Sequence, residues 1–259
     1  AEAVYNPLAW PTTQIVKDED GRFQRITVPA LSTISLSGMS AGDEPLAEIG
    51  DGFVKTPFYK IQLNNDGTLQ QIHDLETGRD YLDGGGNVLT LYEDRPLEYD
   101  NWNIDADYPA KAKVLHADTM RVVENSPLQT KIEFTYTFGA SRLIQTMIVY
   151  AHTRRIDFST HVDWHERQLL LRTAFNTNVR SDTAQFDIQY GNVARPTSDN
   201  TSWDQAKFET VAHKWADLSE RDYGLALLND CKYGYRVKDK QLSLTLLKSG
   251  NYPDTHADE

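Results

Sequence analysis

Residues 186–235 concentrate the side chains of this sequence that suit recognition of a hydroxyl-rich ligand. The stretch holds two tryptophans among charged and hydrogen-bonding residues, namely Arg195, Trp203, Glu209, His213 and Trp215. Tryptophan offers a flat apolar face with an N–H donor, and polar neighbours complement hydroxyl groups, so the combination is typical of a sugar contact. A buried tryptophan cluster with satisfied polar partners is the alternative interpretation.

Two pairs of residues in this stretch carry predictions, one from their spacing and one from the local sequence. Glu209 and His213 stand four positions apart, which on a strand puts both side chains on one face, where they could act as acid and base. A hydrogen-bonded network within a sheet is the alternative. Trp203 follows a polar segment and is predicted to be exposed, whereas Trp215 lies in the strand-like run VAHKWA and is predicted to be the more buried of the two.

An acidic and aromatic run at residues 93–105 is the second candidate. Pro96 cannot donate a hydrogen bond to a central strand, so the run is predicted to leave the sheet as a loop. The loop carries Asp94, Tyr99, Asp100 and Trp102. Loops on a rigid sheet often carry function, so these side chains are predicted either to border a sugar site or to hold an interface between domains.

Three His-x-Asp triplets have a spacing that could serve a metal. They are His116 with Asp118, His161 with Asp163, and His256 with Asp258. The middle pair would share one strand face, but no further Asp and His ligands of a metal motif follow it. We therefore predict a hydrogen-bonded or solvent-facing pair and no metal site. Glu166, close by, is predicted to form an ion pair with Arg167 or Arg172.

The elements that position these residues are predicted to be strands. Apolar residues alternate with polar ones in runs such as 132–138 and 156–164, and many such runs between turn residues are typical of an antiparallel β-sandwich. Further strands are expected at 4–10, 14–17, 23–36, 58–63 and 69–75. The helical segments expected are short, at 202–208 or 217–220.

Three regions are predicted along the chain. Residues 1–37 form a small β unit, too short to bury a core alone, and 38–52, rich in small and acidic residues, form a linker or loop. Residues 53–259 form the large β domain. The first and last residues fall within or just after expected strands, so we expect the sequence to be a piece of a longer chain.

Composition limits the partners. The chain of 259 residues has 38 acidic against 26 basic residues and a net charge of −12, which disfavours nucleic acid and anionic membrane surfaces. No apolar run is long enough to span a membrane and no signal peptide is visible. The single cysteine, Cys231, excludes an internal disulfide. A cytoplasmic protein is therefore expected.

Several runs resemble family 38 α-mannosidases. They are YNPLAW at 5–10, GNVLTLYEDRPLEYDNWNID at 86–105, VDWHERQLLLRTAF at 162–175, GNVARPTSDNTSWDQAKFE at 191–209, HKWADLSERDYGLALLNDCKYGY at 213–235 and LTLLKSGNYPDTHADE at 244–259. The sequence resembles the large β domain of these enzymes, in the branch found in bacteria and in the eukaryotic cytosol and vacuole. The resemblance implies an all-β fold, a large antiparallel supersandwich similar to galactose mutarotases, preceded by the small β unit.

The resemblance also implies that catalysis takes place in another region of the enzyme. Family members place their catalytic carboxylates and their zinc, or another divalent cation, in a region N-terminal to the β domain, so this chain is expected to hold no catalytic residue and no cofactor and to be inactive alone. Its expected role is to wall the active site of a retaining α-mannosidase and to support domain assembly. The expected partners are that catalytic region, a mannose-containing carbohydrate and, in a homo-oligomer, a second copy of the chain.

Residues that would contact the sugar or the domain interface are spread over both candidate segments. They are Asp94, Tyr99, Asp100, Trp102, Arg195, Trp203, Glu209 and His213. As an interface, the chain should expose an apolar patch near Tyr99, Trp102 and the 1–37 unit. Two rivals stay open: a mutarotase-like isomerase or carbohydrate-binding module that uses Glu209 and His213, and a purely structural interface domain.

Overall fold

The chain folds almost entirely into antiparallel strands. A computed structural model describes residues 3–17, 21, 23–36 and 47–252. Within them the helical segments are one short α-helix, α1 (Ser202–Ala206), and one 3-10 turn, η1 (Tyr108–Lys111). The expected all-β fold is confirmed. The helix expected at 202–208 is present, whereas 217–220 belongs mostly to a strand, β19 (Trp215–Ser219).

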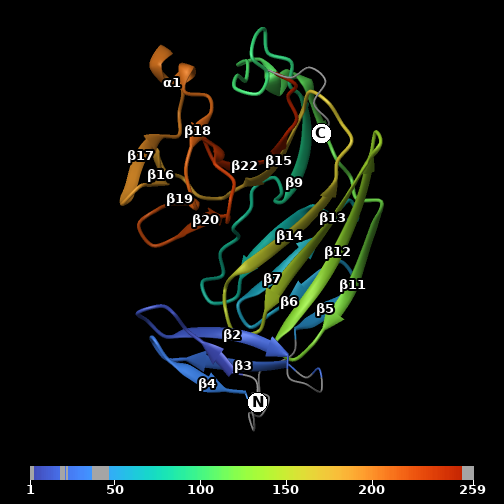
Figure 1. Cartoon of the computed structure of the whole chain (residues 1–259), viewed down its shortest axis with the longest axis vertical. Coiled ribbons are helices and arrows are strands. Elements are labelled where there is room, and N and C mark those ends of the chain that lie inside the picture. The colour runs from blue at the N-terminus through green and yellow to red at the C-terminus, as the bar shows by residue number, and fades with distance from the viewer. Residues whose placement is uncertain (1–2, 18–20, 22, 37–46, 253–259) are drawn as a thin grey trace.

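The N-terminal unit consists of two strand pairs. They are β1 (Ala3–Tyr5) with β4 (Thr33–Ser35), and β2 (Thr12–Lys17) with β3 (Phe23–Val28). The single strand expected at 23–36 is divided in two by a turn that begins after Pro29. The unit lies at one end of the molecule, at the bottom of Figure 1. A cavity of about 470 Å³ lies between its β2–β3 hairpin and residues 152–155 of the large domain.

Two four-stranded sheets enclose the first hydrophobic core. One has the order β5-β6-β7-β8, and the other the order β11-β12-β13-β14. The strands of the first are β5 (Glu48–Gly50), β6 (Phe53–Lys55), β7 (Tyr59–Leu63) and β8 (Leu69–Asp74). Those of the second are β11 (Thr119–Asn125), β12 (Gln129–Phe138), β13 (Ser141–Tyr150) and β14 (Ile156–Asp163). Alternate residues such as Ile132, Phe134 and Tyr136 point inward, as their period of two requires.

The first sheet also corrects one predicted boundary. The linker expected at 38–52 ends too late, because β5 pairs with β6 and Ala47 is already buried in the core. Residues 38–46 lie outside the described part of the chain.

A six-stranded sheet connects the two halves of the large domain. Its order is β10-β9-β15-β22-β21-β18, that is β10 (Ala112–Val114), β9 (Val88–Glu93), β15 (Leu169–Asn176), β22 (Gln241–Lys248), β21 (Gly234–Lys238) and β18 (Thr210–Val211). One face gives Leu89, Leu91 and Leu171 to the first core. Farther along, the same face gives Leu242 and Leu244 to a second core.

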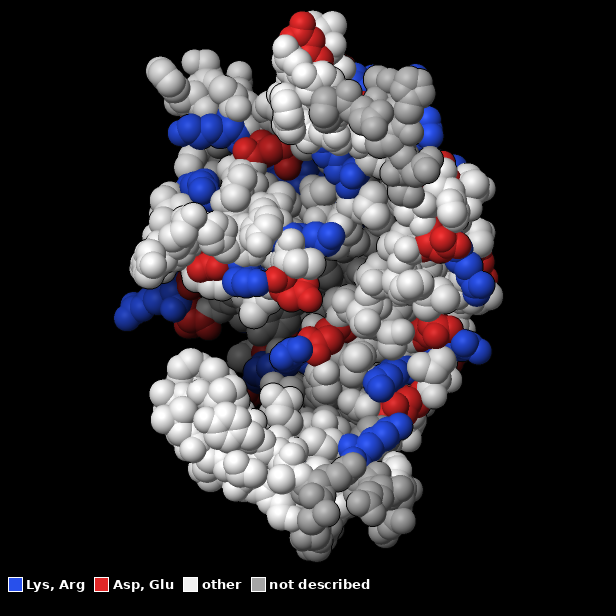
Figure 2. Space-filling view, in the orientation of Figure 1, with Lys and Arg blue, Asp and Glu red and all other residues white. Residues whose placement is uncertain are grey.

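The second core is closed by a small sheet of order β17-β16-β19-β20. Its strands are β16 (Thr183–Ile188), β17 (Gly191–Pro196), β19 and β20 (Gly224–Leu228). Figure 2 shows a hollow in the molecular face between this part and the first sandwich, with cationic and acidic side chains interspersed around it. Sandwich packing with two cores agrees with the predicted architecture.

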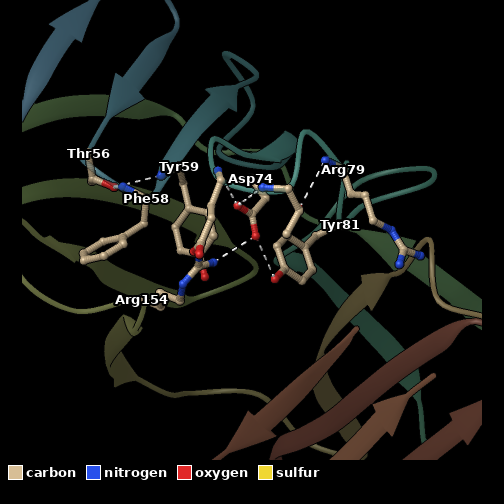
Figure 3. A network of polar contacts seen from close by, with 9 residues as sticks. Thr56, Phe58, Tyr59, Asp74, Arg79, Tyr81 and Arg154 are labelled. Carbon is tan, nitrogen blue, oxygen red and sulfur yellow. Dashed lines mark hydrogen bonds and ion pairs between the residues drawn. The ribbon is translucent and has the colours of Figure 1, made fainter. Parts of the chain in front are cut away.

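A polar and aromatic network ties the two halves together (Figure 3). Asp74, at the end of β8, accepts hydrogen bonds from Arg154 Nη1 at 2.8 Å and from the Tyr81 hydroxyl at 3.3 Å. Tyr81 stacks on Tyr223 of the second core, with ring centroids 4.5 Å apart, and the Arg79 guanidinium lies 3.6 Å above the Tyr223 ring. These contacts connect the end of the first sandwich with the β19–β20 turn.

Candidate functional site

One edge of the six-stranded sheet gathers several of the predicted site residues. Glu93 pairs with Leu169, and Leu170 pairs with Lys248, so β9 ends where β15 begins and where β22 ends. The loop after β9 and the residues after β22 therefore leave the sheet side by side, near the top of Figure 1. We call this place the loop edge. Pro96 does mark the exit from the sheet, as predicted.

Asp94 anchors the first loop at the loop edge. Its side chain is only 2% exposed and forms an ion pair with Lys248. Lys248 Nζ also donates to the carbonyl oxygen of Asn103 at 3.0 Å, which fixes the far side of the loop. Burial raises the pKa of Asp94 despite the opposing pull of Lys248. Asp94 therefore holds the loop in place from below, and a ligand outside the loop does not reach its carboxylate.

Asp100 holds the loop to the end of the described chain. Its carboxylate accepts the backbone N–H groups of Asn251 at 2.9 Å and Tyr252 at 2.7 Å. These bonds, the Asn251 one foremost, lower the pKa of Asp100 below its usual value. Because both of its oxygens accept backbone hydrogen bonds, the Asp100 carboxylate holds the loop in place and does not serve as a proton donor.

The clamped loop presents an aromatic platform, which we define as Tyr99, Trp102 and Tyr252. The Tyr99 centroid lies 5.7 Å from that of Trp102, and the Tyr252 centroid lies 5.0 Å from each. Trp102 is 69% exposed, and Leu97 of the same loop is 92% exposed. The apolar surface predicted around Tyr99 and Trp102 is confirmed. The N-terminal unit also exposes large apolar side chains, Tyr5, Leu8, Trp10 and Leu31, but at the opposite end of the molecule.

A buried ion pair lies on the other side of the loop. Arg172, in the middle of β15, is 2% exposed and faces away from the core residue Leu171. Its Nη1 donates to the Tyr108 hydroxyl at 2.6 Å and to Glu209 Oε1 at 2.5 Å, while the Tyr108 hydroxyl donates to the same Glu209 oxygen at 2.6 Å. Burial acts against the charge of Arg172, but Glu209 outweighs it and raises the Arg172 pKa. Burial also raises the pKa of Tyr108.

This network excludes one of the two ion pairs expected of Glu166. Glu166 does not pair with Arg172, because Glu209 occupies that guanidinium, and the pair with Arg167 stays a prediction. Glu166 accepts from the Ala140 N–H at 2.8 Å and the Ser141 hydroxyl at 3.0 Å.

Glu209 and His213 do not form the predicted acid and base pair on one strand face. The strand between them, β18, has only two residues, and Ala212 turns inward to the second core. Glu209 is held by Arg172 and Tyr108, while His213 packs edge-on against Tyr233 at 5.7 Å.

The two tryptophans differ in the predicted order but not for the predicted reason. Trp203 is 78% exposed on α1, and Trp215 is half-buried. The strand predicted for this run is present, but its core face carries Ala216 and Leu218, and Trp215 lies on the other face.

Arg195 lines a groove between β17, β21 and the segment before β18. The groove has a volume of about 310 Å³. Arg195 Nη1 donates to the Val211 carbonyl at 2.9 Å, and its guanidinium lies 4.6 Å from the centroid of Phe186. Burial alone lowers its pKa, with no carboxylate contributing.

Metal binding has no basis in the described residues. No group of three His, Cys, Asp or Glu side chains there could hold an ion. His161 and Asp163 are exposed, and Asp163 contacts His165 at 3.0 Å; His256 and Asp258 lie outside the described residues. Among the described helices, none has the length and apolar character needed to cross a bilayer.

Sequence reasoning did not select four residues of these candidate sites: Arg172, Tyr108 and Lys248, which hold the loop edge, and Arg236, which lines the groove beside Arg195. One signal was available, because Arg172 interrupts the apolar run Leu169–Leu171 and Ala174–Phe175. A cation in the middle of a buried strand requires a partner. Tyr108 and Lys248 carry no comparable local signal.

The fold is a large antiparallel β-sandwich with two hydrophobic cores. An α-mannosidase from Enterococcus faecalis V583 has a similar fold over 96% of this chain and 33% of its own, with a TM-score of 0.72 at 14% identity. Residues 54–256 match the glycosyl hydrolases family 38 C-terminal domain. The chain belongs to this family.

Curated relatives agree. The chain is 39% identical to alpha-mannosidase G of Dictyostelium discoideum over 217 residues, which cover 81% of this chain. It is also 39% identical to human alpha-mannosidase 2C1 over 204 residues, and 34% identical to an alpha-mannosidase of Saccharomyces cerevisiae over 214 residues. The matched region spans only 20% of the length of each of these relatives.

Proposed function

We propose that this chain is a non-catalytic β region of a retaining, zinc-dependent α-mannosidase that hydrolyses terminal α-mannosides in the cytoplasm. In this proposal the catalytic carboxylates and the zinc ligands belong to another part of the whole enzyme. The chain walls the active site and holds the catalytic region through the loop edge. Family membership supports the parent activity, and the matched relatives are called alpha-mannosidases.

The observation that carries the docking role is the aromatic platform with Leu97. These side chains are exposed, yet the loop beneath them is fixed by Asp94 and Asp100. An exposed apolar surface on a preorganised backbone suits a protein interface, because little conformational entropy is lost on docking. The carboxylates of Asp94 and Asp100, two of the residues predicted to contact sugar, are occupied by Lys248 and by backbone donors. We therefore favour a domain interface over a direct sugar contact.

Complementation in trans tests this role. The parent enzyme without this region would be mixed with the separately purified chain, and hydrolysis of an aryl α-mannoside would be followed. We expect the chain to restore activity, and the double variant Leu97→Ser, Trp102→Ser to raise the concentration needed for half-maximal restoration by about tenfold or more, as for central interface residues.

Leu228→Ser is the matched control. Leu228 is 68% exposed on β20, almost the same fraction as Trp102, but lies in the small sheet. Equal restoration by the double variant and the control would rule out the platform as the docking surface.

The chain alone should not hydrolyse an aryl α-mannoside, with or without added zinc. No described cluster of acidic and histidine side chains could bind the ion, and Asp94 and Asp100 are engaged by Lys248 and by backbone N–H groups. Zinc-dependent turnover well above the solvent rate would contradict a non-catalytic role.

A further inference from the structure

The groove between β17, β21 and residues 197–210 has a charge opposite to that of the whole chain. Its lining contains four cationic side chains, Arg195, Lys207, Arg236 and Lys238, and two acidic ones, Asp199 and Asp204. Two positive charges are therefore in excess there, on a chain whose net charge is −12. A concave site of this sign attracts anions against the field of the rest of the molecule.

Three of the four cations, Arg195, Lys207 and Arg236, form no ion pair with the described residues. Lys238 is paired with Asp199. Arg195 donates only to the Val211 carbonyl, so the rest of its guanidinium is available. Arg236 is half-buried on β21 and makes no side-chain hydrogen bond or ion pair with the described residues, although it feels the charge of Asp199. Arg195 and Arg236 both line the groove, and a planar guanidinium fork suits a phosphate group, which it can bind through two parallel hydrogen bonds.

The remaining lining suits the hydroxyls and the ring of a sugar. Ser198 Oγ accepts from the Asn200 amide at 3.2 Å and keeps its own proton for donation. Asp204 accepts the Thr201 hydroxyl through Oδ2 at 2.6 Å, which leaves Oδ1 for a ligand hydroxyl. Phe208 adds a half-buried aromatic wall for the apolar face of a sugar ring. The volume of about 310 Å³ lies at the small end of the range for ligand sites, which fits a single sugar unit.

We propose that this groove is a binding site for a phosphorylated monosaccharide, with Arg195 and Arg236 on the phosphate and Asp204, Ser198 and Phe208 around the sugar. The inference does not depend on the docking role of the loop edge, which involves other residues.

Calorimetric titration of the 259-residue chain tests the proposal, with mannose 6-phosphate, methyl α-mannoside and inorganic phosphate as separate ligands at constant ionic strength. We expect saturable binding of mannose 6-phosphate, at least tenfold weaker binding of inorganic phosphate, and no measurable binding of the neutral mannoside. Arg236→Gln should weaken mannose 6-phosphate binding by about tenfold or more, the scale of a lost charge-assisted hydrogen bond. Arg236→Lys should give a smaller loss, because it keeps the charge but not the fork.

Arg221→Gln is the matched control, since it removes the same charge from an exposed position outside the groove. It should leave the affinity unchanged. Three results would overturn the proposal: no saturable binding of mannose 6-phosphate, equal affinity for inorganic phosphate, or equal weakening by Arg221→Gln and Arg236→Gln. Thermal melts confirm that the variants are folded, and Arg236 should tolerate replacement because no described partner depends on its side chain.

Discussion

Arg172 shows how one buried side chain can be kept charged. Removing a guanidinium from water costs several kcal/mol unless a counter-charge and hydrogen bonds replace the lost solvation. Glu209 supplies the counter-charge. The Tyr108 hydroxyl accepts a hydrogen bond from Arg172 and donates one to Glu209. The three residues come from β15, from the segment before β18 and from η1, so the pair fixes the position of two loops above the sheet.

Replacing Glu209 by Ala should therefore lower the free energy of unfolding by about 3–5 kcal/mol, the usual cost of leaving a buried charge without its partner. Urea unfolding at neutral pH measures the change. Asp83→Ala is the control, because its ion pair with Lys240 is exposed and should be worth at most about 1 kcal/mol. The double variant Arg172→Met, Glu209→Leu should recover most of the loss. Equal effects of Glu209→Ala and Asp83→Ala would mean that the pair is solvated.

Trp203 and Trp215 should contribute differently to the free energy of unfolding. The difference should be smaller than if Trp215 lay in the hydrophobic core, because Trp215 is only half-buried. Trp203→Ala should cost no more than about 0.5 kcal/mol, as is usual for exposed sites, and Trp215→Ala roughly 1–2 kcal/mol. Leu218→Ala, on the core face of β19, should cost about 2–5 kcal/mol. Denaturant midpoints of the three variants give this order directly. A larger loss for Trp215→Ala than for Leu218→Ala would reverse the assignment of the two faces.

At the scale of elements, alternation predicted the strands of the large domain well. The runs at 132–138 and 156–164 correspond to β12 and β14 within a few residues, because a sheet with one buried face imposes the period of two on its sequence. Errors occurred where local pattern and local chemistry disagree. Pro29 ends a run that hydropathy alone continues to residue 36, and the short strand β5 lies in a stretch whose composition suggests a linker.

The candidate site was predictable only in part, because its contacts are distant in sequence. The loop at 93–105 and its exposed aromatic residues followed from Pro96 and composition. The partners did not: Asp94 pairs with Lys248, 154 positions away, and Tyr108 reaches Glu209 across 101 positions. Which strand edges meet depends on sheet order, and period-two patterns do not encode the order of strands.

The Asp74 network predicts a dependence of stability on pH. Burial favours the neutral form of Asp74, but hydrogen bonds from Arg154 and from the backbone of Glu76 and Thr77 outweigh it and lower the pKa to about 2. A carboxyl group whose folded-state pKa is depressed stabilises the fold above its unfolded pKa of about 3.9 and loses that contribution as the pH falls toward the folded value.

Asp74→Asn should therefore lower the free energy of unfolding by about 2 kcal/mol at pH 6, and the difference from the unaltered chain should shrink between about pH 4 and pH 2. Urea unfolding across this range measures it. Asp51→Asn, at an exposed turn, serves as the control and should show no such convergence. A difference that stays constant down to pH 2 would mean that the charge of Asp74 is not what stabilises the network.

At the scale of the whole molecule, the six-stranded sheet belongs to both hydrophobic cores. Neither core can lose its packing without exposing part of one face of β22, which gives Leu242 and Leu244 to the second core and packs Leu246 and Leu247 against the first. The stacked Tyr81 and Tyr223 rings add a second connection between the halves. This arrangement favours one cooperative transition for the large domain over two independent ones.

Met147→Ala in the first core and Leu218→Ala in the second should therefore both shift a single transition. Near-UV and far-UV circular dichroism, which report on side-chain packing and on backbone structure, should give the same midpoint for each variant. An early separate transition in Leu218→Ala alone would show that the second core unfolds independently.

The clamps at the loop edge also link the platform to the order of synthesis. Asp94 and Asp100 leave the ribosome early, but their partners Lys248, Asn251 and Tyr252 follow about 150 residues later. Until then, the loop has no backbone donors to bind and the third ring of the platform does not exist. A nascent or prematurely terminated chain therefore cannot complete the aromatic platform, and only chains translated through residue 252 carry all three of its rings.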